Sequence, residues 1–267
     1  MTLDLWTGLI TLSLLFLLEG IAPYYLNRSH RLRHGARNLG LALIAGLVGA
    51  AFAPAMLWVM QTADTEGWGI AHLLPMPDWG SALLAFLLFD LWMYVWHRLN
   101  HEWPLLWRLH RVHHSDPEMD ATTALRFHPG EILLSSLLNL PIVLLIGLTL
   151  ETLILYKAVM FIVILLHHSN VALPTTWDRR LGWLLVPPSM HRVHHSERRR
   201  ETDSNYGTIF SFWDRLFGSF CQRDDLSAIR FGIGRFNEPR WQRLSGLLQQ
   251  PWIAKDDPRA PRQSQAH

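Results

Sequence analysis

The chain has 267 residues, of which 49% are hydrophobic and 17% are charged, and its formal net charge is +2. This composition indicates a membrane protein and gives no reason to expect a nucleic-acid partner. A single cysteine, Cys221, excludes an intrachain disulfide and a thiolate cluster, so a metal site would need histidine or carboxylate ligands. Histidine is unusually frequent: there are fifteen, and eleven lie between His97 and His195.

Five stretches approach the roughly 20 apolar residues that a helix needs to cross about 30 Å of hydrocarbon. They are residues 3–26, 39–60, 81–96, 132–150 and 152–166. The first lacks a basic n-region and a small-residue cleavage site, so we expect a helix there and not a signal peptide. The last is short and carries Lys157, so it is expected to be tilted, partly buried by protein, or not fully spanning.

The arginines of the short loops predict how these helices are oriented. The loop 27–38 contains Arg28, Arg31, Arg33 and Arg37, whereas the loop 61–79 contains no lysine or arginine. Short basic loops face the cytoplasm, so the histidine-rich stretches 97–128 and 167–195 both fall on that side. Arginine outnumbers lysine 22 to 2, a hint of a GC-rich bacterial genome. We therefore expect a bacterial inner-membrane protein whose histidines face the cytoplasm.

The histidines on this face recur at short, regular spacings. Nine are candidate metal ligands: His97, His101, His110, His113, His114, His168, His191, His194 and His195. The run His-Arg-Val-His-His-Ser occurs identically at 110–115 and 191–196. Residues three or four apart on a helix lie about 5–6 Å apart on one face, so two of these imidazoles can bind one metal while the third reaches a second. Nine neutral imidazoles are too many for one four-coordinate zinc and suit two metals. Imidazole binds Fe, Zn, Cu and Ni, so the residues alone do not select the metal.

Several other polar residues leave alternatives open. His167 and His128 are possible further ligands; adjacent His167 and His168 cannot point the same way, and His168 is favoured because Ser169 and Asn170 follow it. His128 is either a tenth ligand or a hydrogen-bonding support. The remaining histidines are expected at the surface: His30, His34, His72 and His267.

Asp90 lies two turns before His97, inside a predicted span. There it could hold the imidazole N–H of a ligand from another helix, or pair with an arginine. Glu19, in the first predicted span, raises the same question.

These residues resemble the fatty acid hydroxylase superfamily, which includes sterol desaturases and related bacterial proteins. The resemblance covers about residues 83–220 and follows an ordered set of motifs: Asp90, Tyr94 and Trp96 before His97, both His-Arg-Val-His-His-Ser runs, Thr122 to His128, His168-Ser169-Asn170, Asn205-Tyr206-Gly207, and Trp213 to Gly218. It implies a non-haem di-iron centre held by the nine histidines, O2 as co-substrate, and externally supplied electrons. The superfamily includes hydroxylases, desaturases and ether-cleaving monooxygenases, so the substrate stays open.

The predicted fold class is all-α: an integral membrane bundle of about four to five helices with a cytosolic helical cap that holds a dimetal site. Residues 1–80 would form N-terminal membrane helices, 81–220 the catalytic domain, and 221–267 a polar tail. Within that tail, 241–253 is predicted as a short amphipathic helix and 254–267 as disordered.

The predicted function is hydroxylation or desaturation of a lipid or sterol-like substrate with O2. Attack on an unactivated C–H bond requires an activated-oxygen cofactor. The sequence has no G-x-G-x-x-G unit, so electrons would come from a separate protein, a ferredoxin or a cytochrome b5-like donor with its reductase. A membrane metallohydrolase of the H-E-x-x-H type lacks its motif here. A metal transporter would need ligands along the spans, which offer only Glu19, Asp90 and Lys157. The oligomeric state is left open.

Overall fold

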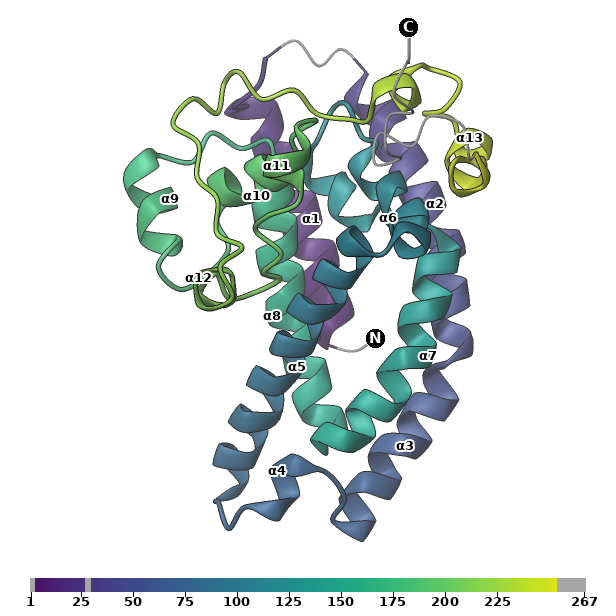
Figure 1. Ribbon diagram of the computed structural model, residues 1–267, viewed down its shortest axis with the longest axis vertical. Coiled ribbons are helices and arrows are strands. Elements are labelled where there is room, and N and C mark those ends of the chain that lie inside the picture. Colours follow the sequence, from purple (N-terminus) through teal and green to yellow (C-terminus); the bar gives the residue numbers. More distant parts are fainter. Residues whose placement is uncertain (1–2, 27–29, 254–267) are drawn as a thin grey trace, which may run out of the picture.

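The computed structural model describes residues 3–26 and 30–253, and over these residues the chain is helical, with three isolated β-bridges and no β-strand. Long helices form the lower part of the molecule and short helices form a cap above them (Figure 1). This agrees with the predicted all-α bundle with a helical cap. The predicted disordered stretch 254–267, and with it His267, lies outside the described residues.

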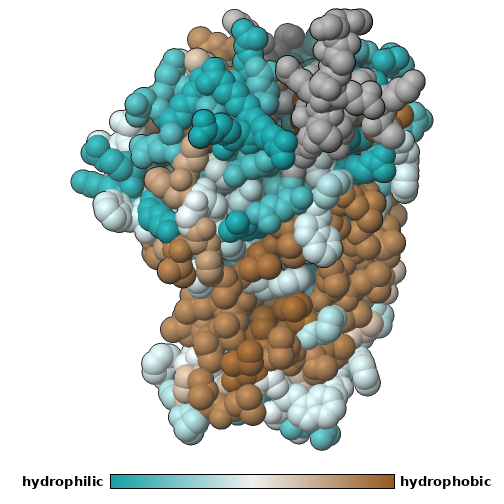
Figure 2. Space-filling model, in the orientation of Figure 1, coloured by the Kyte–Doolittle hydropathy of each residue, from teal (hydrophilic) through white to brown (hydrophobic). Residues whose placement is uncertain are grey.

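Four helices are long and apolar enough to cross a membrane: α1 (Leu3–Ile21), α5 (Asp78–Glu102), α7 (Pro129–Ile146) and α8 (Leu150–His168). The space-filling view shows a continuous apolar belt over this part of the molecule and a polar cap above it (Figure 2). Many leucines on these helices are exposed, including Leu14, Leu17, Leu138 and Leu155. An apolar surface this extensive on a folded chain is suited to lipid contact. The chain is therefore an integral membrane protein.

The second predicted span is broken into two helices. α2 (Arg31–Ala51) and α3 (Ala53–Glu66), continued by α4 (Ile70–Leu73), form a pair bent by 45° that could together make a fifth span. The break falls at Phe52, just before Pro54. Proline has no backbone N–H and cannot continue the hydrogen-bond ladder of the preceding helix, so the predicted stretch 39–60 is divided between two helices at this point.

The third predicted span is longer than the sequence indicated. α5 begins three residues earlier and ends six residues later than 81–96, and it carries both His97 and His101 in its last two turns. α8 has the largest buried share of the four spanning helices, 39%, which agrees with a helix partly covered by protein. It lies along α1 and beside α5 (Figure 1). The ends of α5 and α8 that face the cap thus lie next to each other inside the protein.

The cap is built from short helices. They are α6 (Pro104–His114), η1 (Ala121–Leu125), α9 (Thr175–Leu181), α10 (Pro188–His194), α11 (Arg199–Thr202), α12 (Phe212–Leu216), η2 (Gly234–Asn237), α13 (Leu244–Gln249) and η3 (Gln250–Trp252). The helix predicted over 241–253 is thus shorter, split between α13 and η3. Pro251, which lacks an N–H, is the second residue of η3.

Asp90 connects α5 to α8 and to the segment before α12. Its carboxylate accepts hydrogen bonds from the Tyr156 hydroxyl and the Trp213 indole, both at 2.9 Å, and from the backbone N–H groups of Ile209 and Phe210. None of these partners is an imidazole or a guanidinium. The expectation that Asp90 holds a ligand was therefore wrong, because two turns below His97 the neighbouring donors are Tyr156 and the 209–213 segment.

Glu19 and His34 are buried and join the N-terminal helices to the cap. Glu19 Oε1 accepts from the backbone N–H groups of Ala121 and Asn170, which fixes η1 and the turn after α8 against α1. His34 was expected at the surface, but its two ring nitrogens lie 2.8 and 2.9 Å from Asp116 and Asp120. Carboxylates only accept, so both nitrogens carry a hydrogen and the ring is charged. α2 packs over the loop after α6, which buries this network.

We expect Asp90→Ala to destabilise the fold, because it leaves the buried Tyr156 hydroxyl and Trp213 indole without an acceptor. Each lost acceptor should cost about 1–3 kcal/mol, and Asp90→Asn, which keeps one acceptor oxygen, should cost less. Thermal unfolding in detergent micelles measures the effect. The control is Asp64→Ala on the exposed end of α3, expected within about 0.5 kcal/mol of wild type. An unfolding temperature for Asp90→Ala equal to that of the control would contradict this role.

Candidate metal centre

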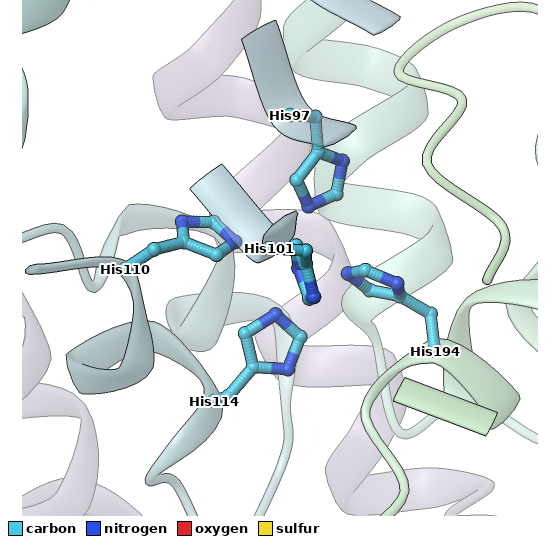
Figure 3. Close-up of side chains that lie close together, drawn as sticks. All are labelled: His97, His101, His110, His114 and His194. Atoms are coloured by element: carbon cyan, nitrogen blue, oxygen red, sulfur yellow. The ribbon is translucent and has the colours of Figure 1, made fainter. Parts of the chain in front are cut away.

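The structure brings all nine candidate histidines together in two adjacent groups at the cap ends of α5 and α8. The first group contains His97, His101, His110, His114 and His194; the second contains His113, His168, His191 and His195. Within each group, one ring nitrogen per residue lies within 4.8 Å of those of the others. The five rings of the first group surround a common centre (Figure 3). Eight of the nine histidines are buried, and His97 is half-buried.

The repeated hexapeptide crosses between the two groups. In the first copy, His110 and His114 belong to the five-histidine group, while His113 belongs to the other. In the second copy, His191 and His195 belong to the four-histidine group, while His194 belongs to the five-histidine group. The two histidines four residues apart share one helical face. The third histidine, which directly precedes the last one in sequence, is turned about 100° away from it. Each copy therefore supplies two imidazoles to one group and one to the other.

The arginine of each copy fixes its short helix to another part of the chain. Arg111 donates to the backbone carbonyls of Gln250 and Ile253, and its guanidinium lies over the Phe236 ring. Arg192 donates to the carbonyls of Ser169 and Val171, and its guanidinium lies over the ring of Tyr24. Both arginines are buried. The arginine of each hexapeptide thus has the same structural role: it binds two backbone carbonyls and packs against an aromatic ring.

The four-histidine group has spacings that suit one metal ion. The Nε2 atoms of His113 and His168 are 3.1 Å apart, those of His168 and His191 3.0 Å, and those of His191 and His195 3.1 Å. Two imidazole nitrogens bound at right angles to one metal, each at about 2.1 Å, lie about 3.0 Å from each other. The nitrogens are therefore spaced as ligands of a common ion.

Buried ring nitrogens without hydrogen-bond partners also point to a metal. Among the described residues, His110 Nε2 and both nitrogens of His114 are buried and have no hydrogen-bond partner. An unsatisfied buried polar atom costs about 1–3 kcal/mol, so several in one place indicate a missing ligand. One metal ion bound within the five-histidine group would satisfy His110 Nε2 and one nitrogen of His114.

Backbone carbonyls and carboxylates orient the rings from outside. His97 Nδ1 donates to Tyr206 O at 2.9 Å, and His168 Nδ1 donates to Ile164 O at 2.7 Å. His110 Nδ1 lies 2.8 Å from Glu131 Oε1. A hydrogen held on Nδ1 leaves the Nε2 lone pair free to bind a metal. The role of Glu131 was missed; its signal was an acid at the start of an apolar helix, next to a histidine-containing motif.

Burial lowers the pKa of His113, His114, His191 and His195, and the neighbouring imidazoles lower it further. These rings are consequently neutral at neutral pH. A neutral imidazole keeps the lone pair that a metal ligand must offer.

His167 and His128 belong to neither group. His167 is buried and its ring stacks on that of His191, with 3.8 Å between the centroids. His128 Nδ1 accepts from the N–H of Gly130 and caps α7, and its Nε2 lies 3.3 Å from Leu248 O. Of the open alternatives, His168 thus joins a group, and His128 has the hydrogen-bonding role. His30 is exposed and His72 is half-buried, away from both groups.

A polar cavity of about 370 Å³ reaches the outer edge of the five-histidine group. Its lining includes His101 and Tyr206, together with two ion pairs, Arg98–Glu102 at 2.7 Å and Arg199–Asp203 at 3.2 Å. Polar partners could thus approach the His101 ring from the aqueous side.

Comparison with known proteins places this arrangement among lipid-oxidising enzymes. A family model described as fatty acid hydroxylase matches residues 82–219, which contain all nine histidines. Ornithine lipid hydroxylase OlsE of Rhizobium tropici is 29% identical over 86% of this chain and 71% of its own length. Alkylglycerol monooxygenase of Danio rerio is 35% identical over 63% of this chain, and cholesterol 25-hydroxylase of Homo sapiens is 28% identical over 51%.

The matched part is a different share of each relative. It spans 38% of the Danio rerio alkylglycerol monooxygenase and 50% of the human cholesterol 25-hydroxylase. No solved structure matches this chain.

The metal content should depend on the two groups and not on His128. His195→Ala should lower the bound metal from about two ions per chain toward one, because it removes one of four ligands. His128→Ala should leave the metal content unchanged and cost only the cap of α7, on the order of 1 kcal/mol of stability. Elemental analysis of purified protein measures both. A loss of metal in His128→Ala equal to that in His195→Ala would make His128 a ligand.

Proposed function

We propose that this chain, which belongs to the fatty acid hydroxylase family, is a membrane-bound non-haem di-iron oxygenase that hydroxylates or desaturates a lipid or sterol-like substrate with O2 and external electrons. The observation that carries the proposal is the convergence of nine histidines into groups of five and four at the membrane end of the cap. The names of the relatives, all hydroxylases or monooxygenases of lipids or sterols, support the reaction class.

The nine histidines would hold two iron ions, one in each group. Bound iron would supply the O2 activation that attack on an unactivated C–H bond needs and that no side-chain acid or base provides, with its electrons replenished by the external donor.

The substrate class is inferred from where the site lies. His97, His101 and His168 are at the ends of the membrane helices α5 and α8. The apolar belt lies directly below the polar cap (Figures 1 and 2). A substrate with an apolar tail could remain in the bilayer while its reacting carbon lies at the cap. The relatives' names include an ornithine lipid, an alkylglycerol and cholesterol, all of which have such a tail.

The cap is proposed to face the cytoplasm of a bacterial cell. Arg31, Arg33 and Arg37 lie in the first two turns of α2, at the end of the helix nearest the cap. Basic residues at one end of a membrane helix favour the cytoplasmic side.

Electrons are proposed to come from a separate protein, such as a ferredoxin or a cytochrome b5-like donor with its reductase. The sequence contains no dinucleotide-binding G-x-G-x-x-G unit. The polar cavity beside His101 is the approach that we assign to this donor, because it brings the aqueous phase to the edge of a proposed ligand ring.

The purified full chain, reconstituted with ferrous iron, should hold about two iron atoms. His113→Ala and His194→Ala should each abolish O2-dependent lipid oxidation, because each removes the ligand that its hexapeptide contributes to the other group. Elemental analysis and product detection by mass spectrometry test this. A protein that binds only zinc and shows no iron-dependent turnover would falsify the oxygenase mechanism.

Comparing the lipids of deletion and overexpression strains should identify the substrate. A single hydroxylated or unsaturated lipid should disappear with deletion and accumulate with expression of the wild-type chain. Expression of His194→Ala serves as the matched control and should give the deletion profile. Identical lipid profiles in all three strains would contradict a lipid substrate.

A further inference from the structure

Three residues of the short segment 203–206 each contact one imidazole of the first group from outside. His194 Nδ1 donates to Ser204 O at 2.6 Å, and His97 Nδ1 donates to Tyr206 O at 2.9 Å. His101 Nδ1 lies 3.5 Å from Asp203 Oδ1. His97 and His101 are on α5 and His194 is on α10, so one short segment touches rings from two distant parts of the sequence.

The chemistry of these contacts determines which nitrogen faces the centre. Backbone carbonyl oxygens only accept hydrogen bonds, so the hydrogen of the His194 ring and that of the His97 ring lie on Nδ1. The Nε2 atom then carries the lone pair and can bind a metal. The segment 203–206 thus selects the same tautomer for these two rings, and its Asp203 carboxylate faces Nδ1 of the third ring, His101. In the four-histidine group, His168 is oriented from elsewhere, by Ile164 O of its own helix.

Asn205 holds the segment in an unusual backbone conformation. Its φ is +54°, a left-handed value that asparagine tolerates better than most residues other than glycine. Its buried side chain donates to the carbonyls of Met190 and Cys221 and accepts from the N–H of Cys221. Three side-chain hydrogen bonds on one residue lock the positions of the carbonyls before and after it.

The segment is also fixed on its other side. The N–H groups of Tyr206 and Gly207 donate to the buried carboxylate of Asp214 at 2.7 and 2.8 Å. Asp203 differs because it is partly exposed at the wall of the polar cavity, where its second oxygen lies 3.2 Å from Arg199 Nε. Asp203 is therefore the member of the segment that is most open to substitution without loss of packing.

We propose that residues 203–206 are a positioning segment for the metal of the five-histidine group alone, with Asp203 and Asn205 as its positioning residues. Asp203 orients the His101 ring. Asn205 fixes the positions of the two neighbouring backbone carbonyls, which orient His194 and His97. The inference rests on the proposed metal centre. It adds that the two metals depend on different outer contacts, so that one can be weakened without the other.

Cobalt(II) binding to the purified full chain in detergent tests this without requiring turnover. Wild type should bind two ions. Asp203→Asn and Asn205→Ala should each weaken one of them by about 10- to 100-fold and leave the other unchanged. Asn205→Gly keeps the left-handed backbone but loses the side-chain bonds, and it should weaken that ion less than Asn205→Ala. Asp225→Asn, on an exposed loop, is the matched control and should bind as wild type.

Single-group backgrounds identify which ion responds. In His195→Ala, where the four-histidine group is impaired, adding Asp203→Asn should weaken the remaining cobalt ion and change its visible absorption, which reports its coordination. In His114→Ala, where the five-histidine group is impaired, adding Asp203→Asn should change neither the affinity of the remaining cobalt ion nor its visible absorption. Equal weakening in both backgrounds, or in neither, would overturn the proposal. A chain that binds two cobalt ions but never oxidises lipid with iron would instead count against the proposed activity.

Discussion

The packing of nine imidazoles against one another is the constraint on which this structure depends. Two groups of five and four rings fill the space between the membrane helices and the cap, and almost all of them are buried. Without metal, their nitrogens would be desolvated with too few partners, which is unfavourable for each of them. Bound metals would turn that cost into binding energy, since metal binding to buried neutral ligands is coupled to folding. The docking of the cap onto α5 and α8 would then be linked to occupancy of the centre.

The identical hexapeptides show how a helix turn distributes ligands between two sites. Spacings of three and four residues place one histidine of each run away from the other two, and so each short helix contributes to both groups. The two histidine groups are thereby fixed relative to each other by α6 and α10. The arginine in each run fixes its helix to carbonyls elsewhere in the cap. Position and spacing of the two groups thus follow from one local pattern used twice.

The sequence was sufficient to predict what periodicity and composition encode. The apolar stretches, the all-α fold and the nine histidines that converge could be predicted because helical spacing and hydrophobic length are local properties. The donors bound by Asp90, the backbone N–H groups bound by Glu19 and the carboxylates that hold His34 could not, because they lie 66 or more residues away and depend on how helices pack. The carbonyls of Ser204 and Tyr206 have no sequence signature at all, since every residue has one. Pro54 could have predicted the break in the second span.

The division of the ligands between membrane and cap explains how one site can serve both an apolar substrate and polar reactants. Three of the nine histidines are on the membrane helices α5 and α8, and six belong to the cap. Each group contains rings from both parts, so neither group forms unless cap and helices meet. The membrane helices α5 and α8 bring three of the rings to the cap from the side of the apolar belt (Figure 2), while the polar cavity beside the segment 203–206 reaches the His101 ring. Electrons and protons from the aqueous side therefore need no path through the bilayer, and the substrate need not leave it.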